Sequence, residues 1–119
     1  MQDFRNLEGW KKAHRLTLAV HKRTADFPNE ERYGLTSQMR RCAVSIPSNI
    51  AKGCGRGSDA DFARFLHIAM GSASELEYQL LLAYDLNFIS EATYRTQADQ
   101  VNEVKRMLGG LLKKLTADS

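Results

Sequence analysis

Apolar residues recur every three or four positions along most of the chain, which is the spacing of helices that bury one face. The first such helix is predicted from Leu7 to about Asp26. Pro28 stops it, because the residue before a proline disfavours helical geometry. Its inward stripe is formed by Trp10, Ala13, Leu16, Thr17, Val20, Thr24 and Phe27. Residues 29–35 then form a connection with room for one helical turn.

The second predicted helix begins at Thr36, whose hydroxyl is expected to accept from the free amides of the first turn. Its apolar stripe consists of Leu35, Met39, Cys42 or Ala43, Ile46 and Ile50. Gly53, Gly55 or both are expected to end it, since glycine is common just beyond the end of a helix.

Pro47 falls in the middle of this second stripe. It lacks the amide that would bond the carbonyl of Ala43, so the helix either kinks there or ends and restarts. A kink is favoured, because the apolar register continues from Ala43 to Ile50. Ser45 and Ser48 are expected to satisfy part of the freed backbone.

The third predicted helix has the most regular pattern, with Ser58 as its cap and Asp59 and Asp61 at its positive end. Its inward seam is formed by Phe62, Leu66, Ala69, Ala73, Leu76, Leu80 and Ala83. A second apolar face carries Phe65, Ile68, Tyr78 and Leu82. A helix with two apolar faces is either central or contacts another subunit, so the pattern also predicts an oligomer. Asn87 is expected to end this helix.

Ser90 caps the fourth predicted helix, which runs to about Lys114. Its stripe consists of Tyr94, Ala98, Val101, Val104 or Lys105, Leu108, Leu111 or Leu112, and Leu115. Gly109 and Gly110 weaken its last turns, where fraying is expected. Four helices with short connections and no comparable strand signal predict an all-α, antiparallel up-down-up-down four-helix bundle as a single domain over residues 1–119.

Composition narrows the class of protein. No apolar run approaches the ~20 residues of a membrane helix, and residues 1–10 lack the apolar core of a signal peptide, so a cytoplasmic location is expected, with no membrane partner. Cys42 and Cys54 are twelve residues apart in one predicted helix, about 18 Å along its axis. They cannot bridge there and are interpreted as reduced packing residues.

The net charge of +3 is unevenly distributed. Residues 1–56 hold eleven basic and five acidic residues, whereas residues 57–119 hold six basic and nine acidic ones. Such asymmetry indicates either an anionic partner or pairing between the two halves. The candidate phosphate-binding residues are Lys11, Lys12, Arg15, Lys22, Arg23, Arg40, Arg41, Lys52 and Arg56. An ordinary solvated face explains them nearly as well, and Arg40 or Arg41 pairing with Glu75 or Glu77 across adjacent helices is the other alternative.

The sequence shows no recognisable catalytic or metal-binding motif, and we expect neither an enzyme nor a cofactor. His14 and His21 are two turns apart, about 10 Å, which is too far for one metal ion. Glu75 and Glu77 point to different faces of a helix and do not form an acid–base pair. The segment 53–58 faintly resembles a phosphate loop but follows a helix and lacks the Gly-Lys-Ser/Thr ending, so a turn is favoured.

Several short motifs together resemble one family. They are Phe27-Pro28, Tyr33-Gly34-Leu35-Thr36-Ser37-Gln38, Arg40-Arg41, Val44-Ser45-Ile46-Pro47-Ser48-Asn49-Ile50-Ala51, Arg56, Ser58, Phe65-Leu66, Gly71-Ser72, Glu75-Leu76-Glu77 and Gln79-Leu80. The chain is similar over nearly its whole length to the four-helix-bundle proteins encoded in intervening sequences of bacterial 23S rRNA genes, also called S23 ribosomal proteins. It departs from their usual pattern at Lys52, where glutamate is common, and at Cys42, where alanine is common.

The resemblance implies a four-helix bundle that assembles into a ring, a homopentamer, and a kinship with accessory proteins of diversity-generating retroelements. The first hypothesis is a non-enzymatic, ring-forming protein that binds nucleic acid, with structured RNA as ligand, through the phosphate-binding residues listed above. The alternative hypothesis is a protein-binding adaptor, such as an accessory subunit for a reverse transcriptase. A nearby retroelement gene would favour the adaptor, and a location inside an rRNA gene would favour RNA.

Overall fold

The structure is a computed structural model that describes residues 2–117. Its helices are α1 (Glu8–Thr24), α2 (Leu35–Cys54), α3 (Asp59–Asp85) and α4 (Glu91–Ala117), with short 3-10 turns at η1 (Phe4–Asn6) and η2 (Asn29–Glu31). The described residues form no strand, so the prediction of an all-helical chain with four main helices is confirmed. The bundle measures 46 × 23 × 20 Å, and no described helix is long and apolar enough to cross a membrane.

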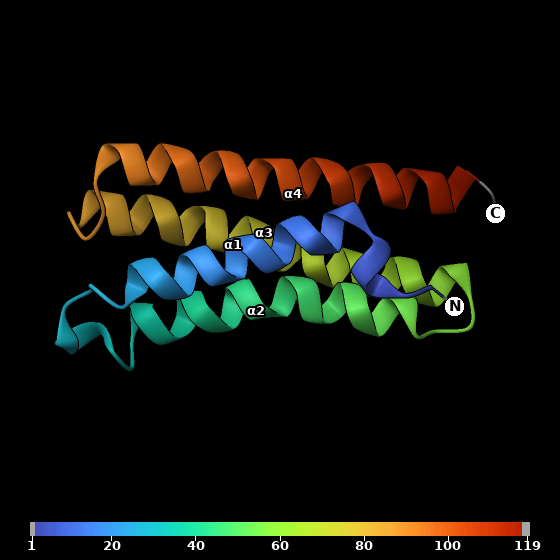
Figure 1. The fold of residues 1–119 in the computed structure, drawn as a ribbon, viewed down its shortest axis with the longest axis horizontal. Helices are drawn as coiled ribbons and strands as arrows, with labels where there is room; N and C mark the ends of the chain where they lie inside the picture. Colours follow the sequence, from blue (N-terminus) through green and yellow to red (C-terminus); the bar gives the residue numbers. More distant parts are fainter. Residues whose placement is uncertain (1, 118–119) are drawn as a thin grey trace.

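Each helix packs against two others, which leaves α1 and α3 on diagonal corners of the bundle (Figure 1). α2 lies between α1 and α3, and α4 closes the other side of the bundle against the same two helices. Along α1 and α2, Thr17 meets Ala43 whereas the later residue Thr24 meets the earlier residue Arg40. These two helices therefore run in opposite directions, as the colour sequence in Figure 1 also shows.

The core consists of the inward stripes that the periodicity predicts. Every residue of the predicted α3 seam is buried, and in α2 both Cys42 and Ala43 are buried. In α4 the inward position is Val104, because the neighbouring Lys105 forms an ion pair with Glu77 of α3, with the Nζ and Oε1 atoms 3.0 Å apart. Burial of these apolar side chains is the main force that holds the four helices together.

The helix ends confirm two predicted caps and correct a third. The Ser58 Oγ accepts from the amide of Asp61 at 3.2 Å, and the Ser90 Oγ accepts from the amide of Thr93 at 3.1 Å. The prediction that Thr36 caps α2 is wrong, since α2 begins one residue earlier. The Glu31 carboxylate on η2 instead accepts from the Leu35 amide at 3.2 Å, so the cap comes from the preceding turn.

The end of α3 agrees with the sequence. α3 ends at Asp85, and Asn87, the predicted stop, has a positive φ of 64°. Asparagine tolerates this left-handed conformation better than most residues, which explains its place just past the helix. α4 continues through Gly109 and Gly110 to Ala117 without an interruption.

α2 continues through Pro47 as a single helix, so the alternative in which it ends and restarts is wrong. The carbonyl of Ala43, which Pro47 cannot bond, lies 3.0 Å from the Thr17 hydroxyl of α1, whose one proton it shares with the Ala13 carbonyl at 2.8 Å. The donor therefore comes from a neighbouring helix, whereas the sequence suggested Ser45 and Ser48. A buried carbonyl that gains such a partner avoids a desolvation cost of about 1–3 kcal/mol.

Gly53 lies in the last turn of α2 because a side chain there would collide with α3. A Cβ at this position would lie 2.7 Å from Cδ1 of Phe62, closer than such atoms approach in proteins. Cys42 and Cys54 are both buried and free, as predicted. Burial, with a smaller contribution from nearby Glu75, raises the pKa of the Cys42 thiol to about 11.

Candidate nucleic-acid interface

Three of the five α1 cations lie on the helix face opposite its buried stripe, and Lys12 and Arg23 lie on the side that meets α4. Lys11, Arg15 and Lys22 recur at steps of four and seven, which places them on one side of a helix. Ala13, Leu16 and Val20 occupy the opposite side and are buried in the core. The predicted grouping of these α1 cations on one surface therefore follows from the way α1 buries its apolar residues.

Two of the five α1 cations are neutralised by carboxylates. The Lys11 ammonium lies 3.1 Å from the Glu8 carboxylate one turn earlier, and the Lys12 ammonium lies 2.9 Å from the Glu103 carboxylate of α4. The hydrogen bond from Lys12 holds the pKa of Glu103 below its ordinary value. This pair joins α1 to α4 and leaves little net charge at that point of the seam between them.

The other three α1 cations, Arg15, Lys22 and Arg23, form no ion pair within residues 2–117. All three are exposed. Their charges are therefore available to an anion from outside the chain. A solvent-exposed cation without a protein partner is the group that phosphate contacts require.

Arg40 belongs to α2 but is bonded to α1. Its Nε donates to the Thr24 hydroxyl at 2.8 Å, and its Nη2 donates to the carbonyl of His21 at 3.2 Å. The suggested pairing of Arg40 with Glu75 or Glu77 is therefore wrong, because Arg40 lies on the edge of α2 that faces α1, whereas α3 packs against a different edge.

The two glutamates of α3 have other partners within the described chain. The Glu77 carboxylate pairs with the Lys105 ammonium of α4. The Glu75 carboxylate accepts from the side-chain amide of Gln79 at 3.0 Å on its own helix. Arg41, the other arginine suggested as a partner, is exposed and forms no ion pair with a described residue.

The remaining candidate cations lie on a different part of the surface. Arg41 and Lys52 are exposed on α2, eleven positions apart, which is about three helical turns and therefore the same side. The Arg56 guanidinium lies 4.8 Å from the centre of the Phe65 ring of α3, a cation–π contact. Because α2 does not contact α4, these residues lie away from the α1–α4 seam. The nine candidates thus fall into two regions, five on α1 and three on or just after α2, with Arg40 at the contact between these helices.

Hollows line the seam between α1 and α4. One of about 340 Å³ is bordered by Lys22, Arg23, Thr93 and Thr96. A smaller one of about 150 Å³ lies between Lys12, Arg15, Gln100 and Glu103. The side-chain carbonyl oxygen of Gln100 is buried and has no hydrogen-bond partner among the described residues. The seam therefore offers hydroxyl and amide groups beside the unpaired cations, a combination suited to phosphate and sugar contacts.

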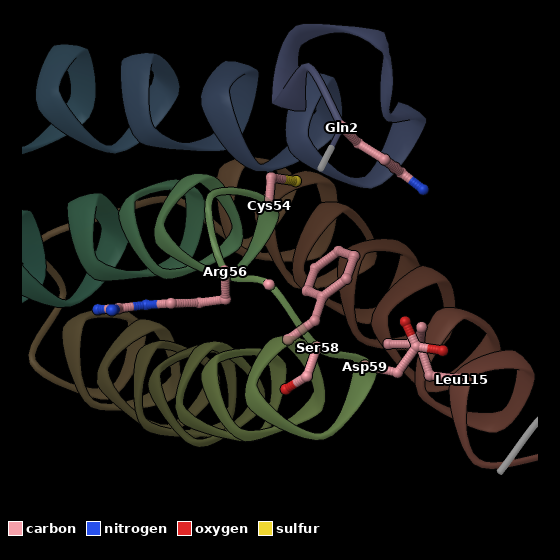
Figure 2. A pocket seen from close by; sticks show the side chains of 8 residues that line it. Gln2, Cys54, Arg56, Ser58, Asp59 and Leu115 are labelled. Carbon is pink, nitrogen blue, oxygen red and sulfur yellow. The ribbon is translucent and has the colours of Figure 1, made fainter.

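The α2–α3 connection forms a separate hollow of about 160 Å³, lined by Gln2, Cys54, Ser58 and Asp59 among others (Figure 2). Arg56 points away from Ser58 and Asp59 in this view. The Ser58 hydroxyl already accepts from the α3 backbone, and Asp59 adds a negative charge at the mouth. Burial raises the pKa of the Cys54 thiol. These features fit a turn, the interpretation favoured from the sequence, better than a phosphate loop.

Two of the three histidines make local contacts. The His14 ring stacks on Trp10 with centroids 5.0 Å apart, and the His21 Nδ1 lies 3.0 Å from the carbonyl oxygen of Thr17. Among the described residues, no group of three or more His, Cys, Asp or Glu side chains is placed to hold a metal ion.

α3 exposes three large apolar residues among polar ones on its outward side. Ile68 is 44% exposed, Tyr78 is 60% exposed and Leu81 is 41% exposed. Phe65, which the sequence placed with them, is instead buried, and Leu82 is half-buried. A Cβ added at Gly71 would meet no atom within 4 Å, so the middle of this face is open. The sequence pattern did not indicate Leu81. Its exposure depends on how α3 packs in the bundle.

Comparisons with known proteins agree on one relationship. A family model described as 23S rRNA-intervening sequence protein matches residues 5–110. The chain is also similar to the crystal structure of a protein with unknown function from the S23 ribosomal protein family of Bacteroides thetaiotaomicron VPI-5482, with 25% sequence identity and a TM-score of 0.82. That match covers 88% of this chain and 95% of the other. No curated protein matches the chain.

Proposed function

The chain belongs to the 23S rRNA-intervening sequence protein family, and from this premise we propose that it is a non-enzymatic, oligomeric protein that binds structured RNA through phosphate contacts. The observation that carries the proposal is the set of three exposed α1 cations, Arg15, Lys22 and Arg23, that form no ion pair within the described chain. Neither the matched family nor the matched structure is described as an enzyme.

The α1–α4 seam is the principal phosphate-binding surface in this proposal. Lys22 and Arg23 border a hollow together with threonine hydroxyls of α4, so a phosphate there would meet both charge and hydrogen-bond donors. Arg40 has a positioning role, because its Nε and Nη2 hold α1 against α2. Arg41, Lys52 and Arg56 make a second, smaller contribution from the other region.

The second part of the proposal is assembly. The apolar outward face of α3 is the contact between copies of the chain, and the ring that the family resemblance implies closes through it. Exposed Ile68, Tyr78 and Leu81 support this part, since three large apolar side chains on one helix lose contact with water when another copy covers them. α1 and α3 are diagonal in the bundle, so the contact leaves the α1–α4 seam open.

The direct test is binding of a labelled rRNA hairpin, followed by fluorescence anisotropy as the salt concentration is raised. We expect measurable binding at low salt and a steep loss of affinity with salt, because each phosphate contact releases counterions. Absence of binding even at ~50 mM salt would contradict the proposal. It would favour the protein adaptor, in which the same cations meet an acidic or nucleoprotein partner.

A further inference from the structure

The α1–α4 seam ends in an apolar hollow of about 290 Å³, between the first turns of α1 and the last turns of α4. Its lining includes Leu7, Gly9, Trp10, Met107, Gly110 and Leu111. We propose that this hollow receives one unpaired base of the RNA whose phosphates lie along the α1 cations. The inference rests on the proposed function and adds a ligand class to it: RNA with an unpaired nucleotide, not a continuous duplex.

Two glycines open the hollow. A Cβ at Gly110 would meet no atom within 4 Å, and one at Gly9 would meet only the Met107 Cβ at 3.8 Å. Glycine weakens a helix interior, yet α4 is continuous through Gly110. The absence of side chains at these two positions leaves the hollow open. Its floor is formed in part by Ile50 and Leu108, which belong to the core and are 1% exposed.

The wall of the hollow includes an aromatic ring that is held in place. The Trp10 ring has Phe4 with its centroid 4.9 Å away and His14 stacked on it, nearly parallel at 8°. An aromatic side chain that is already fixed loses little freedom when a ligand packs against it. Bases bind well to such apolar and aromatic surfaces because every base has a flat π-face.

Charge decides between a base and other apolar ligands. The hollow is lined by Lys114 and by Glu8, whose carboxylate is paired with Lys11. Arg15 lies five residues beyond Trp10, about 7.5 Å along the helix axis and on another side of α1. Farther along the same seam are Lys22 and Arg23. A ligand that enters the hollow and follows the seam therefore needs an apolar group at one end and negative charges along its length. An unpaired nucleotide within RNA has both, and such nucleotides are the usual targets of RNA-binding proteins.

The chain contains a single tryptophan, so Trp10 fluorescence reports occupation of the hollow directly. Three RNAs are titrated: a hairpin with an unpaired loop, the same hairpin with one abasic loop position at a time, and a fully paired duplex of equal length. We expect the hairpin to change Trp10 fluorescence, the duplex to bind without that change, and one abasic position to weaken binding by about tenfold, the range of a lost base–aromatic contact.

A pair of variants tests the hollow itself. Gly110→Leu fills it and is expected to lower affinity for the hairpin about tenfold while affinity for the duplex stays unchanged. Gly109→Ala is the matched control, because Gly109 is the neighbouring residue on the same helix but faces Met70 of α3. It is expected to bind both RNAs as the unmodified chain does. Both substitutions replace a helical glycine, so neither is expected to unfold the bundle.

The outcomes separate the inference from the proposed function. Salt-dependent binding of hairpin and duplex, with no change in Trp10 fluorescence and no effect of Gly110→Leu, would overturn the inference and leave RNA binding intact. That result is also the one expected if the hollow binds an apolar side chain of a protein partner and not a base. Failure of all three RNAs to bind would overturn both.

Discussion

α1 and α3 occupy diagonal corners of the bundle, and each buries one stripe of side chains in the same core (Figure 1). Their outward faces differ in kind. α1 exposes cations such as Arg15 and Lys22, whereas α3 exposes Ile68 and Tyr78. Folding needs only the inward stripe, so the outward face of each helix is free to serve another interaction. In the proposed function, anionic ligands bind on the α1 side and apolar contacts between copies form on the α3 side.

The two helices are also attached to α2 by different contacts. On the α1 side, hydroxyls of Thr17 and Thr24 meet the Ala43 carbonyl and the Arg40 guanidinium. On the α3 side, Gly53 allows close approach of Phe62, and the Cys42 thiol donates to the carbonyl of Ser72 at 3.0 Å. Beyond their shared apolar packing, α1 is thus bonded to α2 through threonine hydroxyls and a guanidinium, and α3 through a buried thiol and a hydrogen bond between the Ser45 and Ser72 hydroxyls.

The largest expected effect is on assembly. Replacing Ile68 and Tyr78 together by lysine places two charges in the proposed contact between copies. Loss of central interface residues commonly costs about 2 kcal/mol or more each, so the combined variant is expected to be monomeric at micromolar concentration. Sedimentation or light scattering measures the mass of the unmodified chain and of the variant under the same conditions.

Leu18→Lys is the matched control for this experiment. Leu18 is a large apolar residue that is 58% exposed, but it lies on α1. We expect it to leave the mass unchanged. A monomeric mass for the unmodified chain, or an equal loss of mass in the Leu18 variant, would remove the distinction between the two faces.

A smaller effect is expected where α1 meets Pro47. Thr17→Val removes the hydroxyl whose proton the Ala43 and Ala13 carbonyls share, while keeping the side-chain shape. We expect a loss of about 1–3 kcal/mol in unfolding free energy, measured as a lower Tm or denaturant midpoint. In a Pro47→Ala background an amide at position 47 can bond Ala43, so the same substitution should cost clearly less. An equal cost in both backgrounds would show that Thr17 does not compensate for the proline.

The smallest effect concerns pH on the α3 side. Because the folded pKa of Cys42 is raised to about 11, the folded state retains the thiol proton that the unfolded state loses at lower pH. The stability linked to this proton is present below pH 9 and falls as the pH rises toward 11. We therefore expect Tm to fall more steeply between pH 9 and 11 in the unmodified chain than in Cys42→Ala. Parallel curves would contradict this account.

Much of the fold was predictable because it depends on local signals. The inward stripes, the Ser58 and Ser90 caps and the stop at Asn87 each follow from a few neighbouring residues. The mistaken Thr36 cap shows the limit of this approach: a hydroxyl at a plausible position was outcompeted by the Glu31 carboxylate on η2. Likewise, the donor that satisfies Ala43 comes from α1, which no periodicity in α2 could indicate.

The candidate site was predictable only as a set of charges. The sequence identified the basic residues but not how the packing divides them between two regions. The sequence left open whether Arg40 pairs with Glu75 or Glu77, because helix periodicity does not tell which edge of α2 faces α1 and which faces α3. The apolar hollow at Gly9 and Gly110 had no sequence signal, because it arises where the start of α1 meets the end of α4. From the sequence, Gly109 and Gly110 were interpreted only as a point where the helix frays. The similarity to retroelement accessory proteins stays a prediction.

The central claim is that the α1 cations carry phosphate binding. Its most direct test compares the slope of log affinity against log salt for an rRNA hairpin in three proteins: the unmodified chain, Arg15→Gln with Lys22→Gln and Arg23→Gln, and Arg41→Gln with Lys52→Gln. We predict that the α1 variant flattens the slope by about 1 for each lost contact, and that the α2 variant flattens it less. An unchanged slope in the α1 variant would contradict the claim.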